Sequence, residues 1–585
     1  MGPDVASRAV TRESLTRPGT TTGAPAEPVA AGRWWALAVL CLPLLIVSLD
    51  NTVLNVALPT LVRELHASDS ELQWIVDAYV LVFGGLMLVA GSLADRVGRK
   101  RTFLAGLTCF ALGSTWAAFS GSVGELVAAR ASMGIGAALI MPSTLSIITN
   151  TFADRSERQR ALGLWSATSA AGVALGPIVG GLLLAHFRWG SVFLINVPVA
   201  LLALALAVRL VPDSRDPHAG HPDVVGSLLS ILGLGLLLWG IIEAPRHGWS
   251  AEVTLGACVA GLAVIACFVA WERASSHPML NLHYFSSHRF SAAVVSNGLV
   301  MFGLYGALFV LTQFMQFQLG YTPLQAGVRV LPAAAGIALV APFSSVLVRR
   351  FGTKLTVAGG LLLVSAGLWQ ISGATVASTY ADTVAGMVML GVGSGLVFPA
   401  GVGAVMGSLP REHTGVGSGT NGAFVQVGGA LGVALVGSLL ATRYEHLLSH
   451  RLAPYHVPHA IEQTLLRSLG AALNVATHVG GVSGAFLEHF ARSAFVSGMD
   501  LGLTVAAIVV AGAAAFALLA LPSRPPEGER DEPPPHPSGR HLIEQPTGVV
   551  SAGAGSRSSS TASSAARSQA ASWEGSSWSP SGAPR

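Results

Sequence analysis

The sequence predicts an all-α membrane protein with about fourteen transmembrane helices, and three observations lead to this fold class. Only 11% of the 585 residues are charged, whereas a soluble chain carries about 25%, and the mean hydropathy is +0.59. The 68 glycines suit membrane helices, in which small residues let backbones approach closely. Apolar runs near the ~20 residues that a bilayer requires recur along the chain.

The apolar runs give the positions of the predicted helices. The first run is too long for the core of a signal peptide, and no small-residue cleavage site follows it, so it is expected to remain as a membrane anchor. The four cysteines lie inside apolar runs and have neither metal-binding nor disulfide spacing, so no metal site is expected. The predicted helices occupy residues 34–58, 72–92, 102–120, 124–149, 160–184, 190–210, 224–244, 253–271, 290–314, 325–348, 355–374, 381–406, 414–441 and 497–521.

The placement of arginine and lysine predicts the orientation in the membrane. Short cytoplasmic loops carry an excess of these residues. With the N-terminus in the cytoplasm, the short outer loops hold little beyond Arg63, Arg188 and Arg246. Both termini are therefore expected to be cytoplasmic. Nucleic acid is not expected as a partner, because no basic cluster is interleaved with aromatic residues. The cytoplasmic loops would hold Arg96, Arg99, Lys100, Arg101, Arg155, Arg158, Arg160, Arg209, Arg215, Arg273, Arg289, Arg349, Arg350, Lys354 and Arg411.

The chain also contains an internal repeat with a nearly constant spacing. Both members of each repeated pair fall in segments of the same orientation, so the repeat is parallel, as in alternating-access carriers. Segment 93–102 recurs at 347–356; Gly134, Gly136 and Pro142 recur as Gly391, Gly393 and Pro399; and Gly172, Gly176 and Gly181 recur as Gly428, Gly432 and Gly437.

The repeat divides the chain into two six-helix halves with an inserted two-helix hairpin. The N-terminal half is predicted at 34–210, the insert and linker at 211–280, and the C-terminal half at 281–521. Within the second half, 442–494 is predicted as a long outer loop that contains a short amphipathic helix, because leucines from Leu465 to Leu473 have helical spacing. The polar termini, 1–33 and 522–585, are predicted to be disordered and cytoplasmic.

Four motifs resemble those of a known family. The segment Gly91-Ser-Leu-Ala-Asp-Arg-Val-Gly-Arg-Lys-Arg101 resembles the signature loop of the major facilitator superfamily, between helices 2 and 3. Segment 49–59 resembles the first-helix motif of the fourteen-spanner drug:proton antiporters. Arg130 with Gly134 and Gly136 resembles the fourth-helix motif, and segment 172–181 resembles the fifth-helix motif of antiporters. The resemblance covers about residues 34–521.

The resemblance implies the major facilitator fold and a proton-coupled antiporter that exports amphiphilic drugs, antibiotics or biocides across the cell membrane. Its partners would be the substrate, protons and the lipid bilayer, and it would function as a monomer. The alternative on the same fold is a transporter of a defined metabolite. An enzyme is not expected, because the sequence shows no nucleotide-binding glycine motif and no nucleophile constellation. Without an ATPase signature, and with no cofactor expected, a proton gradient is the predicted energy source.

Three charges inside predicted helices are the candidates for proton coupling: Asp50, Asp77 and Arg130. Counted from the helix ends, all three lie at a similar depth in the outer half of the bilayer. Intramembrane charges are costly and mark functional sites by default. The alternative is a structural ion pair. In the second half, the position that corresponds to Arg130 is the uncharged Met387, so coupling is expected in the N-terminal half.

The fifth-helix and signature motifs each have a functional and a structural interpretation. Gly172, Gly176 and Gly180 are four apart and line one helix face, beside Pro177 and Gly181, which permits close packing. The resemblance adds a role in occlusion. The resemblance also places the start of the helix near residues 414–417 across from the signature loop, where Asp95 would dock as a gating latch. The alternative is that the loop only anchors the protein at the cytoplasmic surface; its candidate residues are Gly91, Asp95, Arg96, Gly98, Arg99 and Lys100.

A broad apolar cavity with a few polar groups is the predicted substrate site. Each polar group taken alone is more often an interhelical hydrogen bond than a ligand contact. The candidates are Asn55, Gln313, Arg329, Asn421 and Gln426.

Overall fold

The computed structural model describes residues 27–152, 154–215, 222–275, 278–409, 414–455 and 457–522. All described elements belong to the unit Met1–Pro526; the remaining unit, Glu527–Arg585, lies outside the described residues. The predicted tails therefore fall almost entirely outside the description. The exception is the stretch from Glu27, where the first helix begins seven residues before the predicted start.

The described residues form helices and no strands. The first half contains α1 (Glu27–Leu65), α2 (Asp69–Val97), α3 (Arg99–Ala118), α4 (Val123–Thr151), α5 (Arg155–His186), α6 (Ser191–Leu194) and α7 (Asn196–Leu210). The insert contains α8 (Val224–His247) and α9 (Glu252–Ala274). The second half contains η1 (Leu282–Ser286), α10 (His288–Gln313), η2 (Phe314–Gln318), α11 (Pro323–Arg329), α12 (Leu331–Ser372), α13 (Tyr380–Met406), α14 (Thr414–Leu452), η4 (Ala453–Tyr455), α15 (His459–Arg467), α16 (Leu469–Val479) and α17 (Gly481–Ala520).

The helices account for all fourteen predicted segments. Twelve continuous helical stretches of the described chain are long and apolar enough to cross a membrane. One of them, Pro323–Ser372, contains two predicted segments, which meet at Gly352, where the backbone has a φ of 83° and is not helical. The remaining predicted segment, 102–120, corresponds to α3, whose basic first turn lowers its hydropathy.

The packing of the two halves confirms the parallel repeat. A side-chain carbon added at Gly134 of α4 would lie 2.6 Å from the carbonyl oxygen of Tyr79 on α2. At the recurring Gly391 of α13, an added carbon would overlap the carbonyl of Ala333 on α12. The same helix pair is thus in equally close contact in each half, and small residues are required at both crossings.

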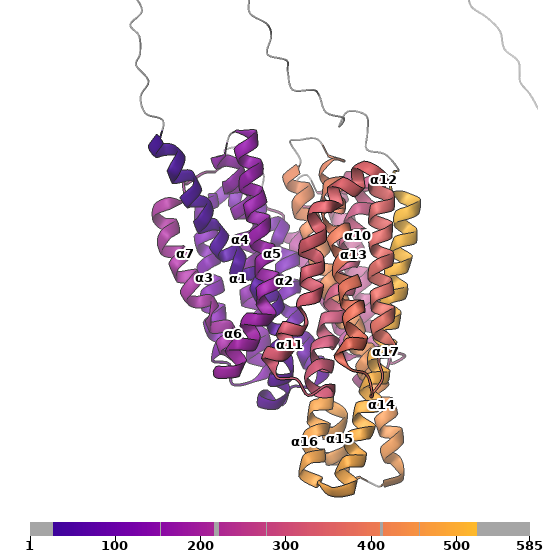
Figure 1. Ribbon diagram of the computed structural model, residues 1–585. Helices are drawn as coiled ribbons and strands as arrows, with labels where there is room; N and C mark the ends of the chain where they lie inside the picture. The colour runs from indigo at the N-terminus through magenta and orange to yellow at the C-terminus, as the bar shows by residue number, and fades with distance from the viewer. Residues whose placement is uncertain are drawn as a thin grey trace, which may run out of the picture. The chain divides into compact units, whose positions relative to one another are not determined.

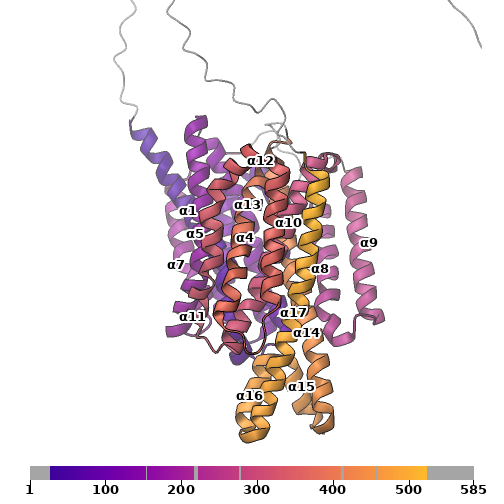
Figure 2. The ribbon, with the colours of Figure 1, turned by 45° about the vertical axis from the view of Figure 1, so that its right-hand side comes forward.

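The insert packs beside the two halves rather than between their cores. On α8, the Ser227 hydroxyl donates to the carbonyl oxygen of Gly85 on α2 at 3.1 Å, and Trp249, just past its end, donates to Thr442 on α14 at 2.9 Å. Helix α9 packs mainly on α8 and is mostly exposed (Figure 2). The hairpin therefore covers one side of the line where α2 meets α14.

Two ends of the helical body can be distinguished (Figure 1). The terminal face holds the start of α1 and the end of α17, and the far face holds α15 and α16. Helices α14 and α17 have 39 and 40 residues, or ~60 Å each, about twice the bilayer core. Both therefore extend past the membrane at the far face. Instead of the predicted long loop with one short helix, residues 442–494 continue these helices and form two short ones between them.

Candidate functional site

A buried ion pair lies between α1 and α4. The Nη1 atom of Arg130 donates to Oδ2 of Asp50, and the two side chains are 1% and 0% exposed. Asn196 at the start of α7 donates to the other carboxylate oxygen of Asp50 at 3.3 Å. A buried charge is tolerated only when it is paired and hydrogen-bonded, and here both conditions hold. Two of the three predicted charges thus meet.

Neighbouring helices fix the orientation of the Arg130 guanidinium. Its Nε donates to the carbonyl oxygen of Ile75 on α2 at 3.1 Å. Its Cζ lies 4.2 Å from the ring centre of Tyr79 and 5.9 Å from that of Phe193. Aromatic faces attract a cation more strongly when water is excluded. Tyr79 and Phe193 were not predicted as partners of Arg130, because the sequence does not show which aromatic side chains the fold brings around α4.

Asp77 is buried but does not bond to Arg130, contrary to the predicted grouping of three charges. Its side chain is fully buried, and neither carboxylate oxygen has a hydrogen-bond partner in the described structure. Asp77 lies one helical turn after Gln73, whose Oε1 accepts from Ser438 of α14 at 3.1 Å. Residues four apart share a helix face, so Asp77 belongs to the face of α2 that meets α14. We call this α2–α14 contact the seam.

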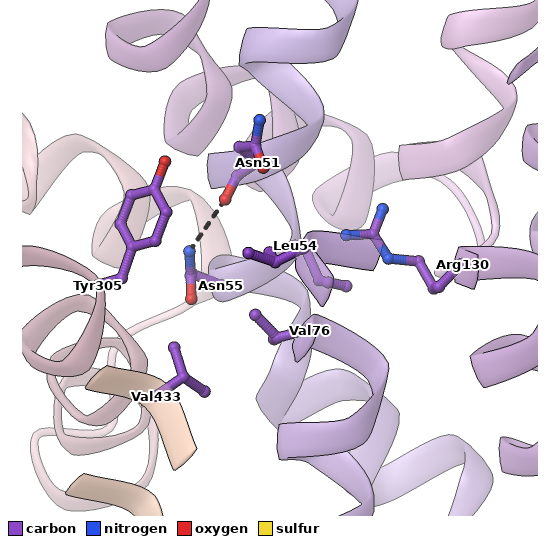
Figure 3. Close-up of a pocket in the computed structure, with 8 residues that line it drawn as sticks. Asn51, Leu54, Asn55, Val76, Arg130, Tyr305 and Val433 are labelled. Atoms are coloured by element: carbon purple, nitrogen blue, oxygen red, sulfur yellow. Dashed lines mark hydrogen bonds between the residues drawn. The ribbon is translucent and has the colours of Figure 1, made fainter. Parts of the chain in front are cut away.

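A small cavity adjoins the ion pair, between the two halves (Figure 3). Its volume is about 10 Å³, which is about enough for one water molecule. Figure 3 shows the Asn55 side chain donating to the carbonyl oxygen of Asn51 one turn earlier on α1, with a nitrogen–oxygen distance of 3.4 Å. The cavity lies between polar groups of α1 and residues of the second half. Its lining residues are Asn51, Leu54, Asn55, Val76, Val80, Arg130, Tyr305 and Val433.

Of the five predicted substrate residues, only Asn55 lines this cavity. Gln313 donates back to its own helix, at the carbonyl of Phe309, and Asn421 accepts from Asn297 within the second half. Gln426 packs against Gly84 across the seam.

The fifth candidate, Arg329, lies at the α11–α12 junction near the far face, 4.1 Å from the ring centre of Tyr321. Asn51 and Tyr305 line the central cavity instead. Asn51 stands inside the first-helix motif and could have been chosen from it, whereas Tyr305 lies outside any motif.

The signature loop forms a tight turn at the terminal face. Gly98 has a φ of 119°, and its repeat partner Gly352 has a φ of 83°, values that disfavour residues with a side chain. Asp95 accepts from Nε of Arg99 at 2.8 Å, and Lys100 donates to the carbonyl of Val208 at 2.9 Å. The loop is thereby tied to the end of α7.

The predicted partner of the loop, the start of the helix near residues 414–417, lies partly outside the described residues. Residues 410–413, and the side chains of residues 414–416, lie outside the described part. Nearby, α14 meets α2 where an added carbon at Gly419 would lie 2.8 Å from Leu88. Gly91 faces Pro142 of α4, and Arg96 lies in the last turn of α2.

A sequence profile of the Major Facilitator Superfamily matches residues 40–433. The chain belongs to this superfamily. It is 37% identical to the multidrug efflux pump LfrA of Mycolicibacterium smegmatis, over 82% of this chain and 95% of that protein. It is 34% identical to the tetracenomycin C resistance and export protein of Streptomyces glaucescens, over 89% and 98%. It is 33% identical to the methyl viologen resistance protein SmvA of Salmonella typhimurium, over 81% and 95%.

The fold of the superfamily is also evident in solved structures. A bacterial homologue of the human lysosomal transporter Spinster superposes with a TM-score of 0.60 at 17% identity, covering 85% of this chain and 97% of that one. At this identity the likeness concerns the fold. The superfamily consists of membrane carriers, which agrees with the predicted multi-pass location in the cell membrane.

The fifth-helix motif of the superfamily has two packing faces in this chain. Gly172, Gly176 and Gly180 face α1, as the spacing predicts: added carbons would meet backbone or side-chain atoms of residues 45–53. Pro177 and Gly181 face α11 of the other half, where an added carbon at Gly181 would lie 2.5 Å from Cα of Leu324. Helix α5 thus joins the two halves near the far face.

A single methyl group is expected to disrupt this packing. In Gly176→Ala, the new carbon would overlap Oγ1 of Thr52 and lie 2.9 Å from the carbonyl of Leu49. Overpacking costs about 1–3 kcal/mol, so thermal unfolding in detergent should occur at a lower temperature. Gly163→Ala is the matched control on the same helix, because nothing lies within 4 Å of its added carbon. Equal stability of the two variants would contradict the close packing.

Proposed function

We propose that this chain is a proton-coupled antiporter that exports amphiphilic small molecules across the cell membrane by alternating access, with both termini in the cytoplasm. The observation that carries the proposal is the buried Asp50–Arg130 pair beside a cavity between the two halves. The names of the similar proteins, which describe efflux of or resistance to drugs, antibiotics and methyl viologen, support the substrate class.

Proton binding by the ion pair would change the charge at the wall of the cavity. When Asp50 binds a proton it loses the charge that holds Arg130, and the guanidinium, which also lines the cavity, is left uncompensated. When the two halves separate and the cavity opens to substrate, a cationic substrate is disfavoured beside protonated Asp50 and favoured when Asp50 is ionised. Substrate and proton thus favour opposite states of one carboxylate, which is the requirement for exchange. Asp77 is the second coupling candidate, because it is the other fully buried acid among the described residues of the first half.

Transport in proteoliposomes tests the proposal. Vesicles that contain the purified chain are given a pH gradient, a sodium gradient or no gradient, and uptake of a cationic dye and of several antibiotics is compared. Accumulation of dye against its gradient should occur with the pH gradient and vanish when a protonophore collapses it. Accumulation driven by sodium alone, or by neither ion, would refute proton coupling.

The signature loop is proposed to act as a latch at the cytoplasmic side. Asp95 would meet the N-terminal end of α14 when that side is closed, an interaction of ~1–2 kcal/mol that shifts a balanced equilibrium about tenfold. In the present structure Asp95 bonds to Arg99. Asp95→Asn should slow turnover without removing substrate binding.

Cross-linking separates the latch from a simple membrane anchor. A cysteine pair at Asp95 and Thr414 should cross-link readily in the outward-facing state and poorly in the inward-facing state. Cross-linking that is equal in both states, or wild-type transport by Asp95→Asn, would rule out the latch.

A further inference from the structure

We propose that Asp69 and Glu445 form the outer access point from which protons reach Asp77 along the seam; this inference rests on the proposed proton coupling and orientation. Asp69 is the first residue of α2, at the far face, and Glu445 stands on the part of α14 that extends past that face. The two acids belong to different halves of the protein, so they meet at the outer end of the line along which the halves separate.

The carboxyl groups of Asp69 and Glu445 lie at the same corner of the protein, where Asp69 is buried and Glu445 is half-buried. Asp69 is 7% exposed, and its charge and that of Glu445 are near enough to interact. Both also interact with the buried phenol of Tyr444, which donates to the carbonyl of Leu465 on α15 at 2.9 Å. Two like charges in such a place repel, and binding of one proton by either acid relieves the repulsion.

The charged groups around Asp69 and Glu445 do not supply enough positive charge to offset both acids. Arg246 of α8 interacts with Glu445, but it also donates to Ser68 at 2.7 Å and pairs with Glu243 at 3.4 Å. Glu71 is engaged in the capping box of α2, where it accepts from the backbone of Ser68. Arg246 therefore divides its charge between Glu243 and Glu445, so it does not offset the charges of both Asp69 and Glu445.

A row of polar side chains leads from this pair into the membrane. Asp69, Gln73 and Asp77 are four residues apart, so they lie on one face of α2 with a rise of ~6 Å between neighbours. Gln73 is fully buried; its Oε1 accepts from Ser438, and its Nε2 has no partner in the described structure. Both oxygens of Asp77 are likewise unpartnered. Buried polar groups require hydrogen-bond partners, so this row offers sites for water and protons inside the seam.

The proton is the ligand that fits carboxyl, amide and carboxyl groups in this order. An O–H bond of Asp69 or Glu445 breaks, water that enters the seam when the halves separate carries the proton past Gln73 over about 12 Å, and an O–H bond forms on the Asp77 carboxylate. The pair then takes a new proton from the outer solution, and no other bond changes. The amide of Gln73 stays neutral and supplies a hydrogen-bond donor between the two acids. Because the seam joins the two halves, proton passage is tied to their relative movement.

Export into outer solutions of different pH tests the role of the pair. Full-length Asp69→Asn and Glu445→Gln are reconstituted, and dye transport is measured at constant inner pH. Loss of a positioned proton donor should slow gradient-driven transport at least about tenfold, with a changed dependence on outer pH. Dye exchange at equal pH on both sides should be unchanged, and Asp69→Glu should restore transport. Glu252→Gln, an exposed acid in the first turn of α9, is the control and should behave as wild type.

The outcomes distinguish this inference from the proposed function. Wild-type transport with an unchanged outer-pH dependence in both variants would overturn the access role. A fall in exchange at equal pH as large as the fall in gradient-driven transport would also overturn it, because the pair would then be structural. If the wild type itself ignores the pH gradient, the proposed proton coupling fails instead.

Discussion

Asp50→Asn protein is expected to reach the membrane and to bind substrate, yet to lose uphill export. The asparagine retains one oxygen that can accept from Arg130, and its amide NH2 can donate to the Asn196 side-chain oxygen, which has no partner in the described structure, once Asn196 turns its amide over. The site should therefore keep its geometry, although loss of the counter-charge of Arg130 lowers the stability of the protein. It cannot bind and release a proton, so the exchange has no titrating group. Loss of a proton-transfer group of this kind lowers rates by ~10²–10⁴-fold. The measurement is dye accumulation in proteoliposomes under an imposed pH gradient, with dye binding measured in parallel.

A matched substitution shows whether the effect belongs to the ion pair. Asp500→Asn removes an exposed acid of α17 and should leave accumulation unchanged. If Asp50→Asn pumps normally against a gradient, Asp50 is not the coupling acid. Asp77 would then become the candidate, and Asp77→Asn should show the loss instead.

Arg130→Met is expected to destabilise the protein and to abolish coupled transport. Methionine occupies the corresponding buried position of the second half, Met387, so its size suits this place in the fold. The substitution leaves the Asp50 carboxylate buried without a counter-charge, which costs about 3–5 kcal/mol. The temperature of thermal unfolding in detergent should therefore be lower than that of the wild type. Any residual transport should have a pH profile displaced toward higher pH, because the ionised carboxylate has lost its partner.

The double variant separates charge from packing. Asp50→Asn combined with Arg130→Met removes both charges, so it should recover much of the stability lost by Arg130→Met alone while remaining unable to pump. A double variant no more stable than Arg130→Met would mean that the arginine acts through its contacts with Tyr79 and Ile75 rather than through the ion pair. An unchanged pH profile in Arg130→Met with normal expression would contradict the pairing altogether.

Membrane spans and the repeat could be predicted because each depends on a property that the sequence carries directly. The bilayer fixes the length of an apolar run, and close helix crossings require small residues at fixed spacing. The same glycines therefore mark the same crossings in both halves, as Gly134 and Gly391 show. Residues 442–494 were predicted as a long loop, whereas α14 and α17 continue into them. The loss of hydropathy marks the end of the membrane but not the end of a helix.

The side-chain partners were harder to predict, for a geometric reason. Counting residues from a helix end gives depth, and it placed Asp50, Asp77 and Arg130 at one level. It does not give the rotation of a helix about its axis. That rotation turns Asp50 toward Arg130 and leaves Asp77 on the face toward α14. The same limit explains why Gln313 and Asn421 bond within the second half while Asn51 and Tyr305 line the cavity.

Proton movement coupled to substrate is the most direct test of the account. Proteoliposomes that contain a trapped pH-sensitive dye are placed in weakly buffered solution with no imposed pH gradient, and an outward substrate gradient is established. The account predicts that substrate leaving the vesicles draws protons in, that the internal pH falls, and that Asp50→Asn abolishes this fall. Substrate efflux by the wild-type protein with no change of internal pH would contradict proton antiport.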